Sequence, residues 1–395
     1  MLRTVILLFA AATAVLAQKT AFDRLKREAA SLKAVPEEKI TDDHVAMAAP
    51  LHLALRDWIE SRLPEDKGLL SVTFGNLESS MQDELKAGLT SPGASPAATD
   101  NAYPDGFGAV DVKLTRFPEM PDSLFVTAGV GVPCGEDEAV YKYDFDADSR
   151  KRVLEDHPKS EWGYAGAALQ LSDPDPQGNR LLLVHRISTQ CASLWMGVAY
   201  SVYRLGYLPG TPEPLLSGEH DFYLTDDGPG FVLKPNELIM EFLGSSVDVD
   251  ILIRTQIHRY KFAIGSQRLD PVAFQPQDFV EEWLTRPWSE MQSRSEPETK
   301  DWHTKIHADF VLADYSNVVP CLYRPGRWLI SLDITNIGEK KLDEPLQAHF
   351  LVRELGDYHY RMEAVSESEL PGCPGEGSAS EKHPWLSASD LKALR

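Results

Sequence analysis

Three short apolar segments recur along the middle of the chain at a constant spacing. The segments are Leu124–Val126, Leu181–Leu183 and Leu238–Met240, and each is typical of a buried strand. Their first residues lie 57 positions apart in both intervals. A fixed long period is the sequence signature of an architecture built from repeated units. The spacing therefore predicts three successive β units and restricts the folds open to this chain.

A second pattern follows each apolar segment. It consists of a tyrosine, a basic residue and an apolar or aromatic residue, and it starts at Tyr141, Tyr203 and Tyr260. A short apolar pair comes 11 or 12 residues after each tyrosine. These pairs are Val153-Leu154, Leu215-Leu216 and Pro271-Val272. We expect each pair to close its unit after a turn.

The units resemble blades of a β-propeller, most clearly at Ala139–Glu155, which reads as an outer hairpin with a closing apolar pair. The resemblance covers about 150 residues and points to no named family. Closed propellers have about 4 to 8 blades. Three units therefore imply either a divergent further blade at Leu69–Pro121 or an open arc. A plain β-sandwich is the alternative architecture.

Different patterns flank the repeat. Leu51–Leu63 carries an apolar stripe that Pro64 ends, which predicts a helix, and a second helix is predicted at Leu77–Leu89. Gln275–Ala308 is helical in pattern and rich in tryptophan, whereas Trp328–Ile334 alternates as a strand does. We therefore predict a mainly β protein, α+β overall. It has a helical N-terminal part, a central propeller-like or sandwich domain, and a small C-terminal β domain.

The predicted divisions of the chain follow from these patterns. They are a signal peptide at 1–17, a helical region and linker at 18–105, a β-repeat domain at 106–275, a helical connector at 276–308 and a C-terminal β domain at 309–395. The linker assignment rests on Thr90–Asp105, which is rich in serine, proline, alanine and glycine.

The N-terminal residues predict where the protein acts. A positive start at Met1–Arg3 precedes an apolar run at Thr4–Leu16, and the small residue Ala17 follows. This is the layout of a secretory signal peptide. The apolar run is shorter than the roughly 20 residues that a membrane span needs. We expect cleavage near Ala17 and a secreted or periplasmic protein whose mature chain has no membrane anchor.

The four cysteines are interpreted in that light. They are Cys134, Cys191, Cys321 and Cys373. An even number of cysteines in an exported chain indicates disulfides, and four cysteines allow three pairings. We favour Cys134–Cys191 with Cys321–Cys373, because each bond then stays within one predicted domain. The absence of CxxC spacing argues against a zinc site and against thioredoxin-like chemistry.

Charge and missing motifs exclude several function classes. The formal net charge is −21, which repels phosphate backbones and anionic membrane surfaces. No GxSxG, GxGxxG or P-loop motif is present, so the sequence supports neither serine hydrolysis nor nucleotide binding. We therefore expect a protein or a glycan as the partner, and we do not expect a nucleic acid.

One acidic segment matches part of a calcium-binding loop. Four carboxylates occupy positions 1, 3, 5 and 12 of an EF-hand pattern: Asp144, Asp146, Asp148 and Glu155. Ser149 stands where that loop has glycine, and the flanking residues are typical of strands. The alternative is an acidic hairpin turn. The sequence predicts no cofactor, unless these four carboxylates bind calcium.

Two further pairs have the spacing of ligands or catalytic groups. His303 and His307 would share one face of a helix and could hold a metal, although the glutamate of an HExxH motif is missing. Asp248 and Asp250 would project from one face of a strand, as paired carboxylates do in glycosidases. A helix end and a solvated strand face are the alternatives.

These observations lead to two functional hypotheses. The first is a non-enzymatic binding or scaffold module of the envelope or extracellular space, because repeated β units display loops around a surface. The alternative is a secreted hydrolase, a glycosidase or peptidase, that uses carboxylates of the central domain. The sequence does not identify catalytic residues.

Overall fold

The structure is a computed structural model. It describes residues 2–35, 44–89, 107–132, 135–158, 163–188, 193–206, 212–224, 228–250, 253–263, 266–269, 272–321, 323–356, 358–368, 370 and 373. The chain is mainly β with an N-terminal helical part, as predicted. It divides into two compact units, Met1–Asp221 and Phe222–Arg395. Each unit has its own hydrophobic core.

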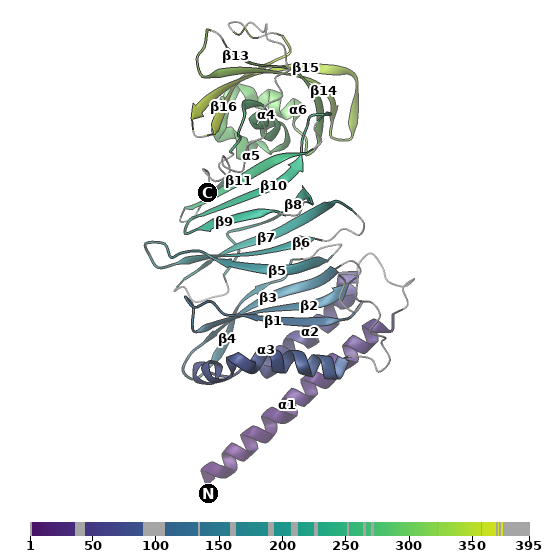
Figure 1. The fold of residues 1–395 in the computed structure, drawn as a ribbon, viewed down its shortest axis with the longest axis vertical. Helices are drawn as coiled ribbons and strands as arrows, with labels where there is room; N and C mark the ends of the chain where they lie inside the picture. Colours follow the sequence, from purple (N-terminus) through teal and green to yellow (C-terminus); the bar gives the residue numbers. More distant parts are fainter. Residues whose placement is uncertain are drawn as a thin grey trace. The chain divides into compact units, whose positions relative to one another are not determined.

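Eight strands of the first part of the chain join in one sheet (Figure 1). They are β1 (Val110–Thr115), β2 (Ser123–Val132), β3 (Gly135–Phe145), β4 (Arg150–Asp156), β5 (Tyr164–Leu171), β6 (Arg180–Ser188), β7 (Trp195–Leu205) and β8 (Leu216–Tyr223). Their order is β1-β2-β3-β5-β6-β7-β8, and β4 pairs with β3 beside this path. Strands β2 and β3 are almost completely buried, because both of their faces are covered.

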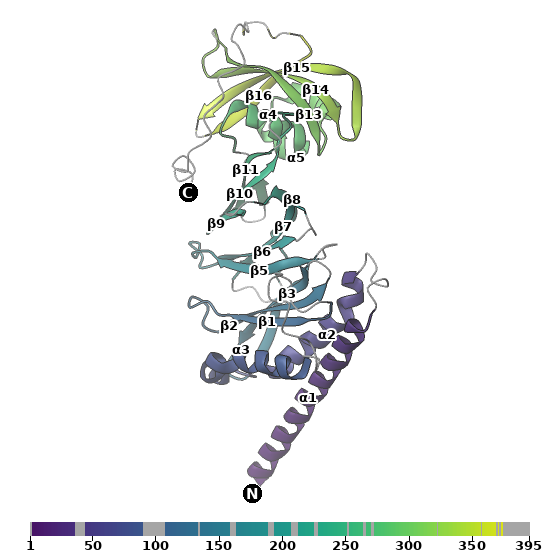
Figure 2. The ribbon, with the colours of Figure 1, turned by 45° about the vertical axis from the view of Figure 1, so that its right-hand side comes forward.

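Three helices precede the strands and cover one face of the first ones. They are α1 (Leu2–Lys33), α2 (His44–Arg62) and α3 (Lys67–Leu89), and the predicted helices correspond to the C-terminal parts of α2 and α3. Figures 1 and 2 both show α2 and α3 alongside β1–β3. Trp58 of α2 and Met81 of α3 are fully buried in a core that they share with Val126 of β2.

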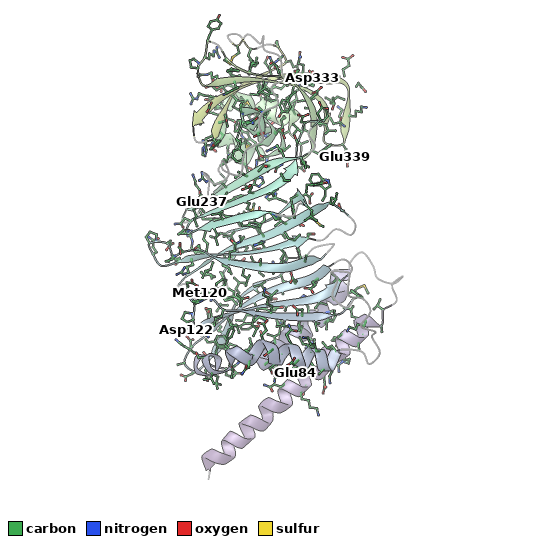
Figure 3. All side chains as sticks on the ribbon, in the orientation of Figure 1. Glu84, Met120, Asp122, Glu237, Asp333 and Glu339 are labelled. Atoms are coloured by element: carbon green, nitrogen blue, oxygen red, sulfur yellow. A yellow bond between two sulfur atoms is a disulfide. The ribbon has the colours of Figure 1, made fainter. Side chains whose placement is uncertain are left out.

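Ion pairs fix the helices at their ends. Nε of Arg62 lies 3.1 Å from Glu84 of α3, and Nζ of Lys67 lies 2.6 Å from Asp122, in the connection between β1 and β2 (Figure 3). Met120 of the same connection packs on the opposite face of the sheet, against a cluster that includes Phe125. Both faces of the first strands are therefore packed.

The strands of the central region recur in sets that keep the interval seen in the sequence. After the eight-stranded sheet, four more strands form a second sheet. They are β9 (Gly230–Lys234), β10 (Glu237–Ser245), β11 (Ile253–Ala263) and β12 (Ser266–Leu269), in the order β12-β11-β10-β9. Within the described residues, β1–β4, β5–β8 and β9–β12 are three sets of four strands that pair in chain order. The second strands begin at Ser123, Arg180 and Glu237, which keeps the interval of 57 residues.

The tyrosine pattern does not occupy equivalent positions in the three four-stranded sets. Tyr141 pairs with Val126, the fourth residue of β2, and Tyr203 pairs with Leu182, the third residue of β6. Tyr260 pairs with the second residue of β10. A shift of one residue moves a side chain to the other face of a sheet. Tyr141 accordingly packs in the core with the helices and Tyr203 packs in the cluster on the opposite face.

The divergent blade suggested for Leu69–Pro121 is wrong. Most of its first part forms α3, and β1 belongs to the first four-stranded set. Residues 90–106, which include the predicted linker, lie outside the described residues. Closure of the units into a propeller remains a prediction.

The second unit ends in an antiparallel sheet with helices in the same core. The sheet has the order β13 (Val311–Pro320), β14 (Arg327–Ile337), β15 (Lys340–Gly356), β16 (His359–Ser366), and the helices are α4 (Pro276–Thr285), α5 (Trp288–Met291) and α6 (Lys300–Ile306). Trp283 of α4 packs against Phe350 of β15 with ring centroids 5.9 Å apart. Helices from the residues predicted as a connector, 276–308, pack in the same core as this sheet.

A disulfide joins Cys321, which follows β13, to Cys373, as predicted. Cys134 and Cys191 lie outside the described residues, so their pairing stays a prediction. Across the described part of the chain, no helix combines the length and the apolar character that crossing a membrane requires.

Candidate functional site

Helix α2 and strand β3 bring two ionisable side chains together inside the first unit. His52 lies on the inward stripe of α2, beside the buried residues Ala48 and Leu55. Asp137 points to the same side of β3 as Ala139, because alternate residues of a strand share a face. His52 is 4% exposed and Asp137 is 1% exposed. The packing of α2 on the sheet therefore buries a histidine against a carboxylate.

A second histidine completes this cluster. His157 follows the last residue of β4, and the pairing of β4 with β3 brings it close to Asp137. Nε2 of His157 lies 2.8 Å from Oδ1 of Asp137. Nε2 of His52 lies 2.8 Å from the backbone oxygen of Asp137 and 3.2 Å from its Oδ2. The two imidazole rings have centroids 4.4 Å apart.

The charge of Asp137 is held by its histidines. Burial raises the pKa of this carboxyl group, but the adjacent imidazoles of His157 and His52 lower it by more, so the pKa lies well below its ordinary value. Asp137 is therefore ionised in the interior. Two buried atoms of the cluster, Oδ2 of Asp137 and Nδ1 of His52, have no hydrogen-bond partner among the described residues.

The opposite face of β3 carries a pair of glutamates. Glu138 stands opposite Gly129 of β2, and a Cβ at Gly129 would lie 2.6 Å from Oε2 of Glu136. Glycine thus leaves the space that the Glu136 carboxyl group occupies. Burial, and then the charges of Glu138 and Asp111, raise the pKa of Glu136 to about 7. Burial also raises the pKa of Glu138, against the charge of Arg186.

A buried ion pair lies next to the glutamates. Nη1 of Arg186 is 2.5 Å from Oδ1 of Asp156, and both side chains are almost fully buried. The hydroxyl of Tyr203 donates to Oδ2 of Asp156 over 2.6 Å. The guanidinium of Arg186 also lies over the ring of Tyr164, 5.7 Å from its centroid. This network joins β4, β6 and β7 and orients the charge that faces Glu138.

The residues of the predicted calcium loop form a β-hairpin. Asp144 lies near the end of β3, Asp146 and Asp148 lie in the turn, and Glu155 lies on β4. The carboxylate of Asp144 accepts hydrogen bonds from Lys142 and from Ser123. Among the described residues, the groups of ligand atoms within 4.8 Å of one another lie elsewhere, so the structure does not bring these four carboxylates together. Calcium at this turn remains a prediction.

The histidine pair at the C-terminal end of α6 makes backbone contacts. The His303 and His307 rings stack with centroids 4.6 Å apart. Nε2 of His303 donates to the backbone oxygen of Arg286 over 3.0 Å, and Nδ1 of His307 donates to that of Leu284 over 2.9 Å. One nitrogen of each ring therefore joins the end of α6 to the C-terminal end of α4, which fits the alternative of a helix end.

Asp248 and Asp250 lie in a turn rather than in the expected strand. The backbone N–H of Asp250 donates to Oδ1 of Asp248 over 2.9 Å, which is an Asx turn. A bridge between Asp248 and Ala313 brings Asp314 close, and the three carboxylates have ligand atoms within 4.8 Å of one another. The short alternation of Val247–Ile251 misled the strand prediction, because turn residues can alternate as well.

Comparison with known proteins identifies no family. No family model and no curated protein matches the chain. Two solved structures of an α-L-arabinofuranosidase from Fusarium graminearum, both in complex with an iminosugar inhibitor, align with a TM-score of 0.23 and 8% identity. The alignment covers 64% of this chain and 65% of that chain, slightly less than two thirds of the enzyme. A similarity at this TM-score supports no conclusion about this chain.

Proposed function

We propose that the mature chain is an exported, non-enzymatic binding or scaffold module that acts in the envelope or outside the cell. Corresponding connections in two of the β units carry this proposal. Leu194 lies between β6 and β7, and Val249 lies between β10 and β11. These apolar side chains are 58% and 40% exposed. Loops held by a rigid scaffold are the usual place for binding residues, and exposed apolar side chains suit a protein or glycan partner.

Crosslinked pull-down from envelope and medium fractions, read by mass spectrometry, tests this proposal. We expect a reproducible partner whose recovery falls at least about tenfold, roughly 1.4 kcal/mol of binding, in Leu194→Asp or in Val249→Asp, each tested by itself. Val72→Asp is the matched control, because Val72 is an 82% exposed apolar residue on α3. Equal recovery with all three variants, or no partner above background, contradicts the proposal. If the signal peptide is cleaved, the intact mass of the exported protein should equal that of a chain that begins at Gln18.

The glutamate pair favours a second candidate, a secreted glycosidase or peptidase. Glu136 and Glu138 interact directly on one face of β3, and the Glu136 carboxyl group occupies the space beside Gly129. Two neighbouring carboxyl groups can serve as general acid and general base. The test is product release from panels of glycans and peptides. Glu136→Gln and Glu138→Gln should each lower turnover by about 100-fold or more, whereas Glu119→Gln, an exposed control, should not. Turnover unaffected by both variants excludes this candidate.

A further inference from the structure

Side chains from three elements of the first unit converge with the spacing of metal ligands. One ligand atom each from His52, Asp137 and His157 lies within 4.8 Å of the other two. The carboxylate oxygens are 3.2 Å from Nε2 of His52 and 2.8 Å from Nε2 of His157. In a tetrahedral zinc site with bonds of about 2.0–2.1 Å, neighbouring ligand atoms lie about 3.3 Å apart. The donors are therefore close to the required separation without a large movement of the backbone.

An unsatisfied charge independently points to a ligand in this cluster. Oδ2 of Asp137 is buried in a side chain that is 1% exposed, and it accepts no hydrogen bond from the residues that the structure describes. Nε2 of His52 carries at most one proton. It donates that proton in a hydrogen bond to the backbone oxygen of Asp137, which lies closer, at 2.8 Å, than Oδ2 does. A buried carboxylate oxygen without a donor is costly. A cation between Asp137 and the two imidazoles would remove that cost.

We propose that His52, Asp137 and His157 form a binding site for a divalent first-row metal ion, with zinc as the best-matched species. Two imidazoles and one carboxylate are a ligand set that zinc uses when it keeps an open coordination position. Calcium and magnesium prefer oxygen ligands alone, so the two histidines select against them. Coordination through Nε2 places the ring proton of His52 on Nδ1, and the metal bond replaces the hydrogen bond from Nε2 to the backbone oxygen of Asp137.

The exposure of the three residues indicates how the metal enters. His52 and Asp137 are buried, whereas the side chain of His157 is 29% exposed. The ion would therefore arrive from the His157 side, and a water molecule could occupy the fourth position there. The cluster has a net charge of −1 when both histidines are neutral, and a divalent ion changes this to +1. This site is independent of the binding surface and of the glutamate pair proposed above.

Metal titration of the whole exported chain, purified without a histidine tag, tests this inference. After chelation and dialysis, we expect one equivalent of Zn²⁺ to bind in calorimetry, and Co²⁺ to give the visible absorption of a tetrahedral site. His157→Gln and Asp137→Asn should each weaken Zn²⁺ binding at least about tenfold. The controls are His359→Gln, which changes a histidine outside the cluster, and Asp314→Asn, which alters the exposed triple-aspartate group.

The outcomes separate this site from its rivals. Binding that His157→Gln abolishes and that both controls leave intact supports the inference. Stoichiometric binding that depends on Asp314 instead, or the absence of Zn²⁺ and Co²⁺ binding by a folded chain, overturns it. Circular dichroism establishes that each variant is folded. Because His157 is partly exposed, His157→Gln still tests the site if Asp137→Asn fails to fold.

Discussion

Neighbouring residues of β3 have opposite environments because each step along a strand changes the face. Asp137 points to the helices and is held as an ion by two histidines, whereas Glu136 and Glu138 point to the other face, where their pKa values are raised. The three acidic residues are consecutive in the sequence. Only the structure shows that they belong to two different clusters, since the partners come from α2, from the residue after β4 and from β6.

Breaking the buried ion pair of Arg186 and Asp156 should destabilise the first unit more than changing an exposed charge does. Arg186→Met leaves Asp156 as an unpaired buried charge, and we expect a loss of about 3–5 kcal/mol in the free energy of unfolding. Tyr203→Phe removes one hydrogen bond to the same carboxylate and should cost about 1–2 kcal/mol. Urea unfolding measures both losses. The control is Lys151→Met, which changes an exposed cation of β4. A loss in Arg186→Met no larger than in this control refutes the prediction.

Asp278 should make the stability of the second unit depend on pH. Burial, opposed in part by the charge of Arg254, raises the pKa of this carboxyl group to about 6, from 3.8. Folding is therefore penalised when Asp278 is ionised, and the penalty grows as the pH rises from about 4 to about 6.5. Asp278→Asn should gain up to about 3 kcal/mol of stability near pH ~7.5 and nothing near pH ~3.5. An equal effect at both pH values contradicts this assignment, and the exposed Glu298→Gln should show no difference.

At the level of elements, strand positions could be predicted from the sequence better than strand pairing. The apolar runs are visible in the sequence, and β2, β6 and β10 keep their interval of 57 residues. The pairing shifts because the connections to the next strand differ, at 133–134, 189–194 and 246–252. Connection length gives no apolar signal, so the sequence did not show that Tyr141, Tyr203 and Tyr260 pair at different positions along the preceding strand.

The Cys321–Cys373 disulfide should stabilise the C-terminal sheet because it closes a loop and so restricts the unfolded chain. The two cysteines are 52 residues apart, and the loop-closure model assigns about 4 kcal/mol to a bond of that span. We expect Cys321→Ala with Cys373→Ala to lower the free energy of unfolding by about 2–4 kcal/mol. Denatured protein without reductant should show no more than two free thiols. Four free thiols would exclude the bond, and an unchanged stability would exclude its proposed effect.

At the level of the whole molecule, the candidate metal site could not be predicted from the sequence. His52 and Asp137 are 85 residues apart, and Asp137 and His157 are 20 apart, so no local motif connects them. The helices were predictable because their apolar stripes are local. The docking of α2 on β3 depends on packing across the whole first unit. By contrast, the motif-like sets at Asp144–Glu155 and at His303 and His307 have the spacing of ligands but make other contacts.

Two compact units with separate cores should unfold in two steps. Leu55 is fully buried in the core of the first unit, and Phe350 is fully buried in the core of the C-terminal sheet. Removing such a side chain costs about 2–5 kcal/mol, and the cost falls on the core that loses the packing. Calorimetry should therefore show two transitions, with Leu55→Ala lowering the midpoint of one and Phe350→Ala lowering the other. A single transition that both variants shift together would mean that the chain unfolds as one cooperative body, because a two-state transition couples every core to every other.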